Sequence, residues 1–279
     1  MGLPMCRRLL EAGHSLRVWN RTRAKADTLG PHGAVVCSNA AEAIDGAEYV
    51  FCMLDTGAVI DRVMFDSAGA AVDEMADNAV LTVMSSIPVA TALRQAARLA
   101  ARGAYYVDAP VSGGERGALS GTLTIMAGGD IAVVERVRPL LETLGRLTRV
   151  GPIGTGQLTK LANQAIVAIT IGAVSEAFAL ARRGGADLSQ VRAALLGGFA
   201  DSEVLRQHGE RMLERSFAPG ARAEIQLKDL CTASALASEL GIDLPLLRVA
   251  GNQFQRLCDS GHRRLDHSAL YLLWEQAVG

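Results

Sequence analysis

The stretch VGPIGTGQLTK, from Val150 to Lys160, marks the point where the chain changes character. Before it, short apolar runs alternate with helix-like stretches. After it, segments of helical period follow one another, separated by turns rich in Gly, Pro and Asp. Strands alternating with helices predict an α/β domain, and a run of helices predicts a separate helical domain. We therefore predict an α/β domain in residues 1–152 and an all-helical domain in residues 153–279.

Apolar runs predict the strands of the first domain, at 15–19, 33–36, 48–54, 79–84, 104–108 and 122–127. Helical periodicity predicts helices between them, at 3–12, 38–45 and 89–102. Several of the strand runs are apolar throughout rather than alternating, which is typical of parallel strands buried on both faces. The pattern predicts a parallel sheet covered by helices on both sides.

The second domain is predicted to be helical at 157–183, 188–197, 202–214, 222–240, 244–258 and 265–277. The first of these segments is longer than an ordinary globular helix and apolar on nearly all sides, so we expect it to be buried between domains or between subunits. A homodimer or homotetramer is therefore expected.

The composition excludes several classes of function. The net charge of −1 offers no attraction to nucleic acid or to an anionic membrane surface. No uninterrupted apolar run of about 18 residues predicts a membrane span. The start lacks the order of a signal peptide, so we expect a cytoplasmic protein.

Cysteine and histidine usage points to no metal or disulfide. The five cysteines form no CxxC pair, and their odd number is typical of reduced thiols in a reducing compartment. The histidines, which also show no metal-ligand spacing, are His14, His32, His208, His262 and His267.

The chain opens MGLPM, followed directly by an amphipathic helix. A dinucleotide-binding fold normally begins with a strand, then G-x-G-x-x-G, then a helix, so one glycine and the helix are present here. Asn20, Arg21 and Thr22 follow the run at 15–19, where such folds meet the adenosine ribose. An acid there accepts from the 2′-hydroxyl, whereas an arginine accommodates a 2′-phosphate. Arg21 with Thr22 therefore favours NADP over NAD; an exposed arginine without a ligand is the alternative.

Lys160 is the candidate for proton transfer. It begins the long helix after the turn at Gly154 and Gly156, and Asn163 shares its helix face. A lysine can protonate a developing alkoxide as hydride reaches a carbonyl, and a neutral lysine can take the hydroxyl proton in reverse. A cation in a first helical turn opposes the helix dipole, which indicates a use. A surface or capping lysine is the alternative.

The segment DAPVSGG, residues 108–114, follows a strand end, where open α/β sheets bind ligands. Ser112 and the backbone amides of Gly113 and Gly114 can bind a carboxylate through neutral donors. An ordinary turn made by Pro and Gly is the alternative.

The chain resembles the β-hydroxyacid dehydrogenase family, which includes 3-hydroxyisobutyrate dehydrogenases, tartronate semialdehyde reductases and glyoxylate/succinic semialdehyde reductases. The resemblance rests on motifs in the same order from end to end: MGLPM (1–5), VWNRT (18–22), SSI (85–87), DAPVSGG (108–114), GxGxxxKLxN (154–163) and LKDL (227–230). It implies a Rossmann-type nucleotide-binding domain followed by an all-α C-terminal domain. The family begins with a strand and GLGxMGxPM, so we expect the native protein to carry about a dozen more N-terminal residues.

The resemblance also implies a role for each site residue. Lys160 is the catalytic acid/base, and Ser112, Gly113, Gly114 and Asn163 bind and orient the substrate. Asp229 belongs to the wall of the active site. The expected cofactor-binding residues are Gly2, Leu3, Asn20, Arg21, Thr22, Leu54, Asp55, Ser86 and Lys228.

Two departures from the family pattern concern the substrate. Val83 replaces an acid that often precedes the Ser-Thr pair of the family, and Ala221 stands where many relatives carry a phenylalanine. Losing that ring widens the pocket, because an aromatic side chain covers about 150–250 Å².

The expected function is reversible, NADP-dependent reduction of a small carboxylate-bearing semialdehyde or oxo acid to a β-hydroxy acid, with NAD as the alternative cofactor. An imine reductase of the same architecture is one alternative function, but such enzymes usually carry another residue at the position of Lys160. A non-catalytic dinucleotide-binding or interaction protein is another. The joint presence of Lys160, Asn163 and Ser112 argues against it.

Overall fold

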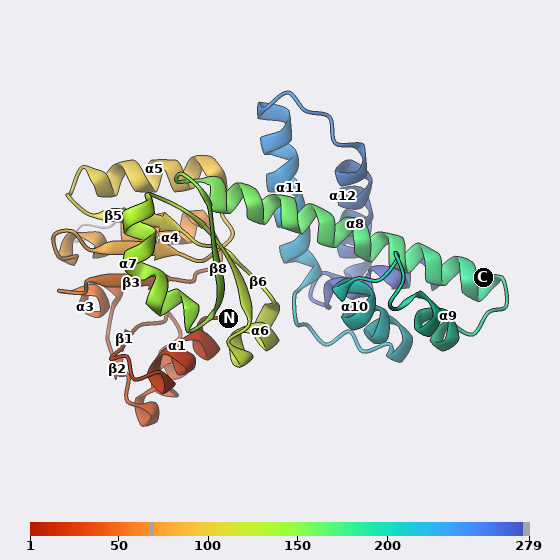
Figure 1. Ribbon diagram of the computed structural model, residues 1–279, viewed down its shortest axis with the longest axis horizontal. Helices are drawn as coiled ribbons and strands as arrows, with labels where there is room; N and C mark the ends of the chain where they lie inside the picture. The colour runs from red at the N-terminus through yellow and green to blue at the C-terminus, as the bar shows by residue number, and fades with distance from the viewer. Residues whose placement is uncertain (67–69, 276–279) are drawn as a thin grey trace. The chain divides into compact units, whose positions relative to one another are not determined.

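The computed structural model describes residues 1–66 and 70–275, and the chain divides into two compact units, Met1–Lys160 and Leu161–Gly279. Among the described residues, every named strand lies in the first unit, and the second unit is helical (Figure 1). A Rossmann-type α/β unit followed by an all-α unit is thus the fold, as the sequence predicts.

A mixed sheet forms the centre of the first unit, in the order β3–β4–β5–β7–β6, with β8 paired to β7. A separate parallel pair joins β1 to β2. The strands are β1 (Arg17–Val18), β2 (Val35–Val36), β3 (Tyr49–Cys52), β4 (Val80–Val83), β5 (Tyr105–Asp108), β6 (Val111–Ser112), β7 (Leu123–Gly128) and β8 (Gly145–Gly151). Because β3, β4 and β5 are parallel and in register, their last residues, Cys52, Val83 and Asp108, are neighbours.

The all-parallel arrangement that the sequence predicts is wrong at β7, which runs antiparallel to both β5 and β6. The connection from β6 to β7 covers residues 113–122, which is shorter than the dozen or more residues of a parallel crossover. The sequence also misses β6 and β8. In β8, exposed and buried positions alternate at first, so the strand has no continuous apolar run that would mark it.

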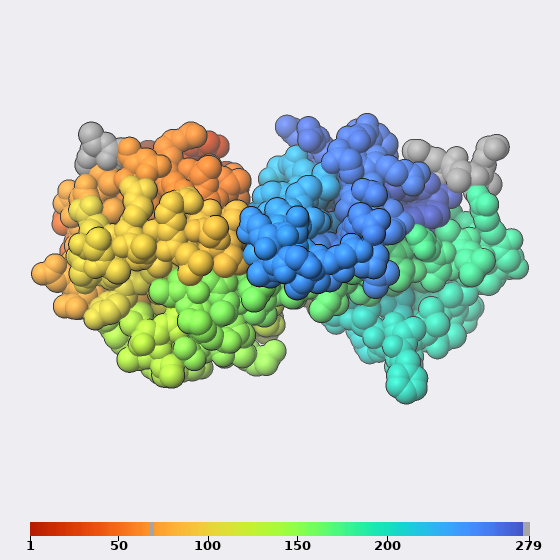
Figure 2. All heavy atoms as spheres, turned by 90° about the horizontal axis from the view of Figure 1, so that it is seen from above, coloured from red at the N-terminus to blue at the C-terminus, as the bar shows by residue number. Residues whose placement is uncertain are grey.

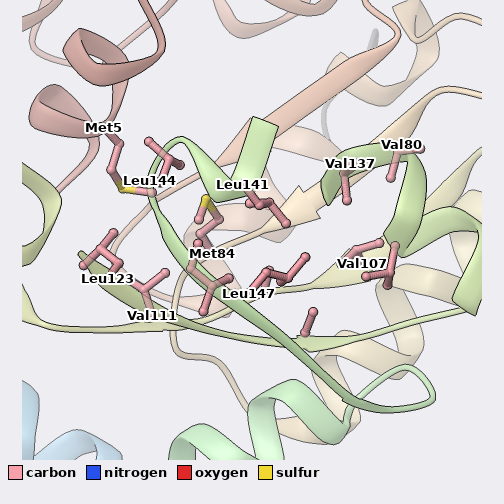
Figure 3. Close-up of a cluster of buried hydrophobic side chains, with 14 of the residues drawn as sticks. Met5, Val80, Met84, Val107, Val111, Leu123, Val137, Leu141, Leu144 and Leu147 are labelled. Carbon is pink, nitrogen blue, oxygen red and sulfur yellow. The ribbon is translucent and has the colours of Figure 1, made fainter. Parts of the chain in front are cut away.

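Helices of the first unit pack against both faces of the sheet. They are α1 (Gly2–Glu11), α2 (Arg23–Asp27), η1 (Gly30–His32), α3 (Ala40–Ile44), α4 (Gly57–Met64), η2 (Ala71–Glu74), α5 (Val89–Ala100), α6 (Gly114–Ser120) and α7 (Ile131–Glu142). Successive residues of β4 point to opposite faces: Val80 joins a core with α1 and α7, and Leu81 joins a core with α4 and α5. Figure 3 shows the first of these cores, with Met5 and Leu141 among its side chains.

The second unit is built from helices joined by short turns. They are α8 (Thr155–Arg183), which begins in the first unit, α9 (Leu188–Leu195), α10 (Glu203–Glu214), α11 (Ala223–Glu239), α12 (Pro245–Leu257), η3 (Cys258–His262), η4 (His267–Tyr271) and α13 (Leu272–Glu275). Side chains of Asp187 and Ser202 cap α9 and α10. The continuous helix predicted at 265–277 is instead the 3₁₀ turn η4 followed by α13. Residues 276 and 277 lie outside the described part.

By length and composition, α8 could cross a membrane, which is weak evidence because core helices of soluble proteins pass the same test. Only 33% of its most apolar window is buried in the chain. Ile166 and Leu180 are 66% and 76% exposed. The chain alone therefore does not supply the burial expected for this helix, and the predicted absence of a membrane partner stays a prediction.

One buried carboxylate, Asp266, joins distant segments of the second unit. Its Oδ2 accepts from the backbone N–H groups of Gly220 and Ala221, each at 3.0 Å, and pairs with Arg211 at 3.0 Å. Its Oδ1 accepts from the hydroxyl of Ser268 at 2.6 Å. These donors occupy both oxygens, which is how a buried charge is stabilised.

Two histidine rings lie beside this carboxylate. Nε2 of His208 and Nε2 of His267 are 3.1 Å apart, and candidate metal-ligand atoms of His208, Asp266 and His267 lie within 4.8 Å of one another. The sequence spacing did not predict this grouping. However, Asp266 already has its donors, and the Arg211 guanidinium facing it disfavours a nearby cation. We therefore interpret the group as a structural hub.

We expect Asp266→Asn to lower the free energy of unfolding by about 2 kcal/mol at pH 7. Burial raises the pKa of Asp266, but the nearby His267 and the hydrogen bonds outweigh it and hold the pKa at about 2. Because the folded pKa is depressed, this stability is present above pH about 4 and is lost as the pH falls toward about 2. Urea unfolding at a series of pH values measures it.

The exposed Asp243 offers a matched control, because its side chain is 79% exposed and lies 3.7 Å from its arginine partner. Asp243→Asn should change stability by less than about 0.5 kcal/mol at every pH. If Asp266→Asn retained the steep acid limb of the natural protein, Asp266 would not be its source.

Candidate active site

The start of α8 is fixed to the sheet by Asp108, the fully buried last residue of β5. Its Oδ1 accepts from the backbone N–H of Gly154 at 2.7 Å, and its Oδ2 accepts from that of Gln157 at 2.8 Å. Burial raises the pKa of Asp108 to about 6, against the opposing effect of these hydrogen bonds. A carboxylate at a helix N-terminus satisfies N–H groups that have no partner within the helix.

Glycines allow this close approach. A Cβ on Gly128 of β7 would lie 2.6 Å from Oδ1 of Asp108. A Cβ on Gly156 would lie 2.4 Å from the backbone oxygen of Met126. The glycines of the GxG motif therefore bring the helix start into contact with the strand ends.

Gln157 ties the same helix turn to β4. Its Oε1 accepts from the backbone N–H of Ile87 at 3.0 Å, and its Nε2 donates to the backbone oxygen of Ser85 at 2.9 Å. The hydroxyl of Ser85 in turn accepts from the backbone N–H of Leu54 at 2.8 Å. This network connects the carboxyl ends of β3 and β4 with the first turn of α8.

Lys160 lies one helical turn after Gln157 and is only 8% exposed. Asn163 follows one turn later and is half-buried, so the two residues share a helix face as the spacing predicts. A lysine side chain is almost never so buried unless its charge is paired with another group.

Asn163 begins a polar network inside the second unit. Its Nδ2 donates to Oε1 of Gln164 at 3.0 Å, and Nε2 of Gln164 donates to Oδ2 of Asp229 at 2.7 Å. Lys228 pairs with Oδ1 of Asp229 at 3.0 Å. The structure thus brings together three predicted site residues, Asn163, Lys228 and Asp229, through a glutamine that the sequence analysis did not single out.

The predicted carboxylate-binding segment is not an ordinary turn. Ser112 lies on β6 opposite Thr124, and Gly113 and Gly114 begin α6 with φ of +127° and +61°. Both glycines are exposed and Ser112 is half-buried. Strand β8 pairs with one edge of β7, and β5 and β6 both pair with its other edge. Asp108 lies opposite Gly128 of β7 and Ser112 lies opposite Thr124, so the two residues are four positions apart along β7.

Apart from Lys228, which lies inside α11, the predicted cofactor residues follow strand ends or begin a helix. Leu54 and Asp55 come after β3, and Ser86 comes after β4. Arg21 and Thr22 are exposed after β1, where the side chain of Asn20 donates to the backbone oxygen of Thr22 at 2.9 Å.

The start of α1 fits the phosphates of a dinucleotide. The helix begins at Gly2 and Leu3, and in the described chain no side chain caps it and no acid lies in its first turn. Its first N–H groups can therefore bind an anion. Gly2 also lies close to the end of β3, because a Cβ placed on it would be 3.9 Å from Met53. Gly2, Leu3, Arg21 and Thr22 would hold the phosphates and ribose of the cofactor.

Sequence reasoning missed Ser85, Asp108 and Gln157, which fix the helix that carries Lys160. Asp108 and Gln157 both fall inside motifs quoted above. However, no local pattern reveals that residues 49 positions apart are hydrogen-bonded.

An α/β unit with polar and glycine residues at the carboxyl ends of its strands, followed by helices and a buried lysine, defines a nicotinamide-dependent oxidoreductase of two units. Known sequences agree. Residues 1–156 match the NAD binding domain of 6-phosphogluconate dehydrogenase, and residues 154–274 match the family described as NAD-binding of NADP-dependent 3-hydroxyisobutyrate dehydrogenase. The chain belongs to the β-hydroxyacid dehydrogenase family, and it is an NAD(P)-dependent enzyme that acts on a CH–OH group.

Relatives cover nearly the whole chain. It is 42% identical to the 2-hydroxy-3-oxopropionate reductase of Escherichia coli K12, over 97% of this chain and 92% of the relative. A solved structure of 3-hydroxyisobutyrate dehydrogenase from Mycobacterium tuberculosis with L-serine has a TM-score of 0.89 at 29% identity, over 98% of this chain and 95% of that one. An imine reductase from Myxococcus stipitatus with NADP⁺ has a TM-score of 0.65 at 20% identity, over 97% and 95%, and shares the fold alone.

Proposed function

We propose that this enzyme interconverts a small β-hydroxy acid and its semialdehyde or oxo acid, with Lys160 as general acid/base and NADP as preferred cofactor. The observation that carries the proposal is the burial of Lys160, 8% exposed, on a helix start fixed to the ends of β4 and β5. A fixed side chain holds its proton in one place relative to a bound carbonyl, which is what acid–base catalysis requires.

The proposed chemistry divides between the cofactor and the protein. The bound nicotinamide supplies or accepts the hydride. In reduction, the ammonium of Lys160 gives its proton to the carbonyl oxygen, so that a hydroxyl forms. In oxidation, the neutral amine of Lys160 takes that proton back.

Substrate binding is proposed for the segment at β6 and α6. Ser112 offers a hydroxyl, and Gly113 and Gly114 offer backbone N–H groups at the start of α6. Neutral donors of this kind bind a carboxylate without an opposing charge. Asn163 would orient the reacting oxygen. Its place one turn beyond Lys160 supports that role.

The name of the E. coli relative, 2-hydroxy-3-oxopropionate reductase, supports a short semialdehyde acid as substrate. A panel of short semialdehydes, 2-oxo acids, hydroxy acids and cyclic imines, followed by the absorbance of NADPH, tests the proposal. We expect turnover of carboxylate-bearing aldehydes and none of imines. Imine reduction without hydroxy-acid turnover would replace this proposal with an imine reductase.

Cofactor choice gives a testable prediction at Arg21. We expect Arg21→Ala to raise KM for NADPH by about tenfold or more, because a charge-assisted bond to the 2′-phosphate is lost. KM for NADH, which has no such phosphate, should stay within about twofold. Steady-state kinetics with both cofactors measure this.

Arg23 provides the control for Arg21. It is exposed two residues further on and pairs with Asp27 at 3.4 Å. Arg23→Ala should leave both KM values unchanged. An equal rise in KM for NADPH and NADH in Arg21→Ala would show that Arg21 does not select the phosphate.

We also propose that the enzyme self-associates through apolar surface of the second unit. Exposed apolar side chains on α8, such as Ile166 and Leu180, support this. So does the connection between α11 and α12, where Leu240, Ile242 and Leu244 are exposed. Figure 2 shows that connection, in mid-blue, on the face toward the viewer. Sedimentation velocity distinguishes a dimer or tetramer from a monomer.

A further inference from the structure

Besides the bonds of Gln157 to the end of β4, one side chain on β5, Asp108, anchors backbone N–H groups at the start of α8. Asp108 is 0% exposed, and its two oxygens are used separately, one for the N–H of Gly154 and one for that of Gln157. These N–H groups belong to the start of the helix, where no carbonyl of the same helix can accept from them. Two bonds to different residues of one turn fix both the height and the rotation of the helix start.

The position of Lys160 depends on that turn. Lys160 lies three residues after Gln157, which in an α-helix means about 4.5 Å along the axis and nearly the same face. Because the helix is rigid over so short a distance, a shift of its first turn moves Lys160 by a similar amount. A displacement of about 1 Å at a reacting group can cost about a hundredfold in rate.

The charge of Asp108 has a second effect on the same lysine. The N-terminus of a helix carries partial positive charge and disfavours an ammonium group in its first turns. A carboxylate seated on that N-terminus offsets this, so it favours the protonated lysine that reduction requires. A neutral group of the same shape would keep the packing but not this electrostatic effect.

We propose that Asp108 is a positioning residue of the reaction, which acts through Lys160 by holding the first turn of α8 with an ionised carboxylate. The inference rests on the proposed role of Lys160. A positioning role for Asp108 explains why Gly128 and Gly156 pack so closely against its carboxylate. A Cβ on either glycine would come within 2.8 Å of a carboxylate oxygen of Asp108.

The ionisation of Asp108 predicts how kcat depends on pH. Burial raises the pKa of Asp108 to about 6. Protonation below that pH removes its charge, so kcat should fall as the pH drops through about 6. Two titratable neighbours of Asp108 stay neutral at that pH, because burial raises the pKa of Tyr106 well above its ordinary value and that of Cys52 to about 12.

The test uses Asp108→Asn in the full chain. The amide keeps the shape but turns an N–H toward a backbone N–H, so we expect kcat to fall about ten- to a hundredfold. KM for NADPH should stay within about twofold, and the fall in kcat near pH 6 should disappear. The amides of residues 154–160 should also exchange hydrogen faster.

Asp61 provides the matched control. It is a half-buried carboxylate of α4 whose oxygens pair with Arg94 at 2.6 Å and Gln95 at 2.7 Å, both on α5. Asp61→Asn should cost stability while leaving kcat and its pH profile unchanged. A loss of kcat equal to that of Asp108→Asn would reduce Asp108 to a structural residue and overturn the inference.

Hydrogen exchange separates this inference from the proposed function. If Lys160→Ala keeps its turnover, the proposed function fails and the inference fails with it. If Lys160→Ala loses turnover while Asp108→Asn keeps both kcat and slow exchange at 154–160, only the inference fails. If Asp108→Asn does not fold, the pH dependence of kcat of the natural enzyme provides the test. A kcat that stays constant between pH 5 and pH 7 would overturn the inference, and a fall in kcat centred at about pH 6 would support it.

Discussion

Replacing Lys160 with alanine will lower kcat by about two to four orders of magnitude and leave the dissociation constant of NADPH within about threefold. The side chain is 8% exposed and lies on a helix start that Asp108 and Gln157 fix to the strand ends. Without the amine, only water can exchange a proton with the substrate oxygen. Steady-state kinetics give kcat, and the quenching of protein fluorescence gives the affinity for NADPH.

Two variants control this experiment. Lys160→Arg keeps a cation but cannot take up or release a proton near neutral pH, so it should be nearly as inactive as the alanine variant. Lys25→Ala removes an exposed lysine of α2 and should leave kcat unchanged. Near-normal turnover in Lys160→Ala would remove the general acid/base from the proposed mechanism and leave the binding of cofactor intact.

The change from an α/β unit to a helical unit could be predicted because it is a change in period, which is a local property of sequence. Each predicted strand run overlaps an observed strand for the same reason. The antiparallel course of β7 could not be predicted in this way. It follows from the short connection at 113–122, and the tertiary pairing, rather than the residue types, decides its direction.

Within the candidate site, the shared helix face of Lys160 and Asn163 could be predicted because residues three apart in a helix lie on one face. Asp108 and its partner Gln157 could not. Their bond joins a carboxylate to a backbone N–H 49 positions away, and every residue type except proline offers such an N–H. The register that sets Val83 beside Asp108 is likewise a property of the sheet.

The helical unit shows the same limit. Ser202 and Asp187 are local caps, so the starts of α10 and α9 can be predicted from sequence to within a residue or so. The buried Asp266, in contrast, accepts from Gly220, 46 positions away. Only the folded chain shows that the pair of histidines beside it shares a site with Arg211.

Gly156→Ala will lower the free energy of unfolding by about 3 kcal/mol. The added Cβ would lie 2.4 Å from the backbone oxygen of Met126, 2.6 Å from that of Asp108 and 2.8 Å from Oδ2 of Asp108. Two of these atoms belong to the backbones of β7 and β5, which are held by sheet pairing and cannot rotate aside. The helix start must therefore move, and kcat should fall together with stability.

Gly251→Ala makes the same chemical change where there is room, since no atom lies within 4 Å of a Cβ at that position of α12. It should raise the free energy of unfolding by about 0.5–1 kcal/mol, because alanine favours the helix. In urea unfolding, the change in the free energy of unfolding should therefore be negative for Gly156→Ala and positive for Gly251→Ala, although each variant adds one methyl group. If the free energy of unfolding of Gly156→Ala were within about 0.5 kcal/mol of that of the natural protein, the start of α8 would not be packed tightly against the strand ends. A loosely held start could not fix Lys160, so the same measurement also bears on how the lysine is positioned.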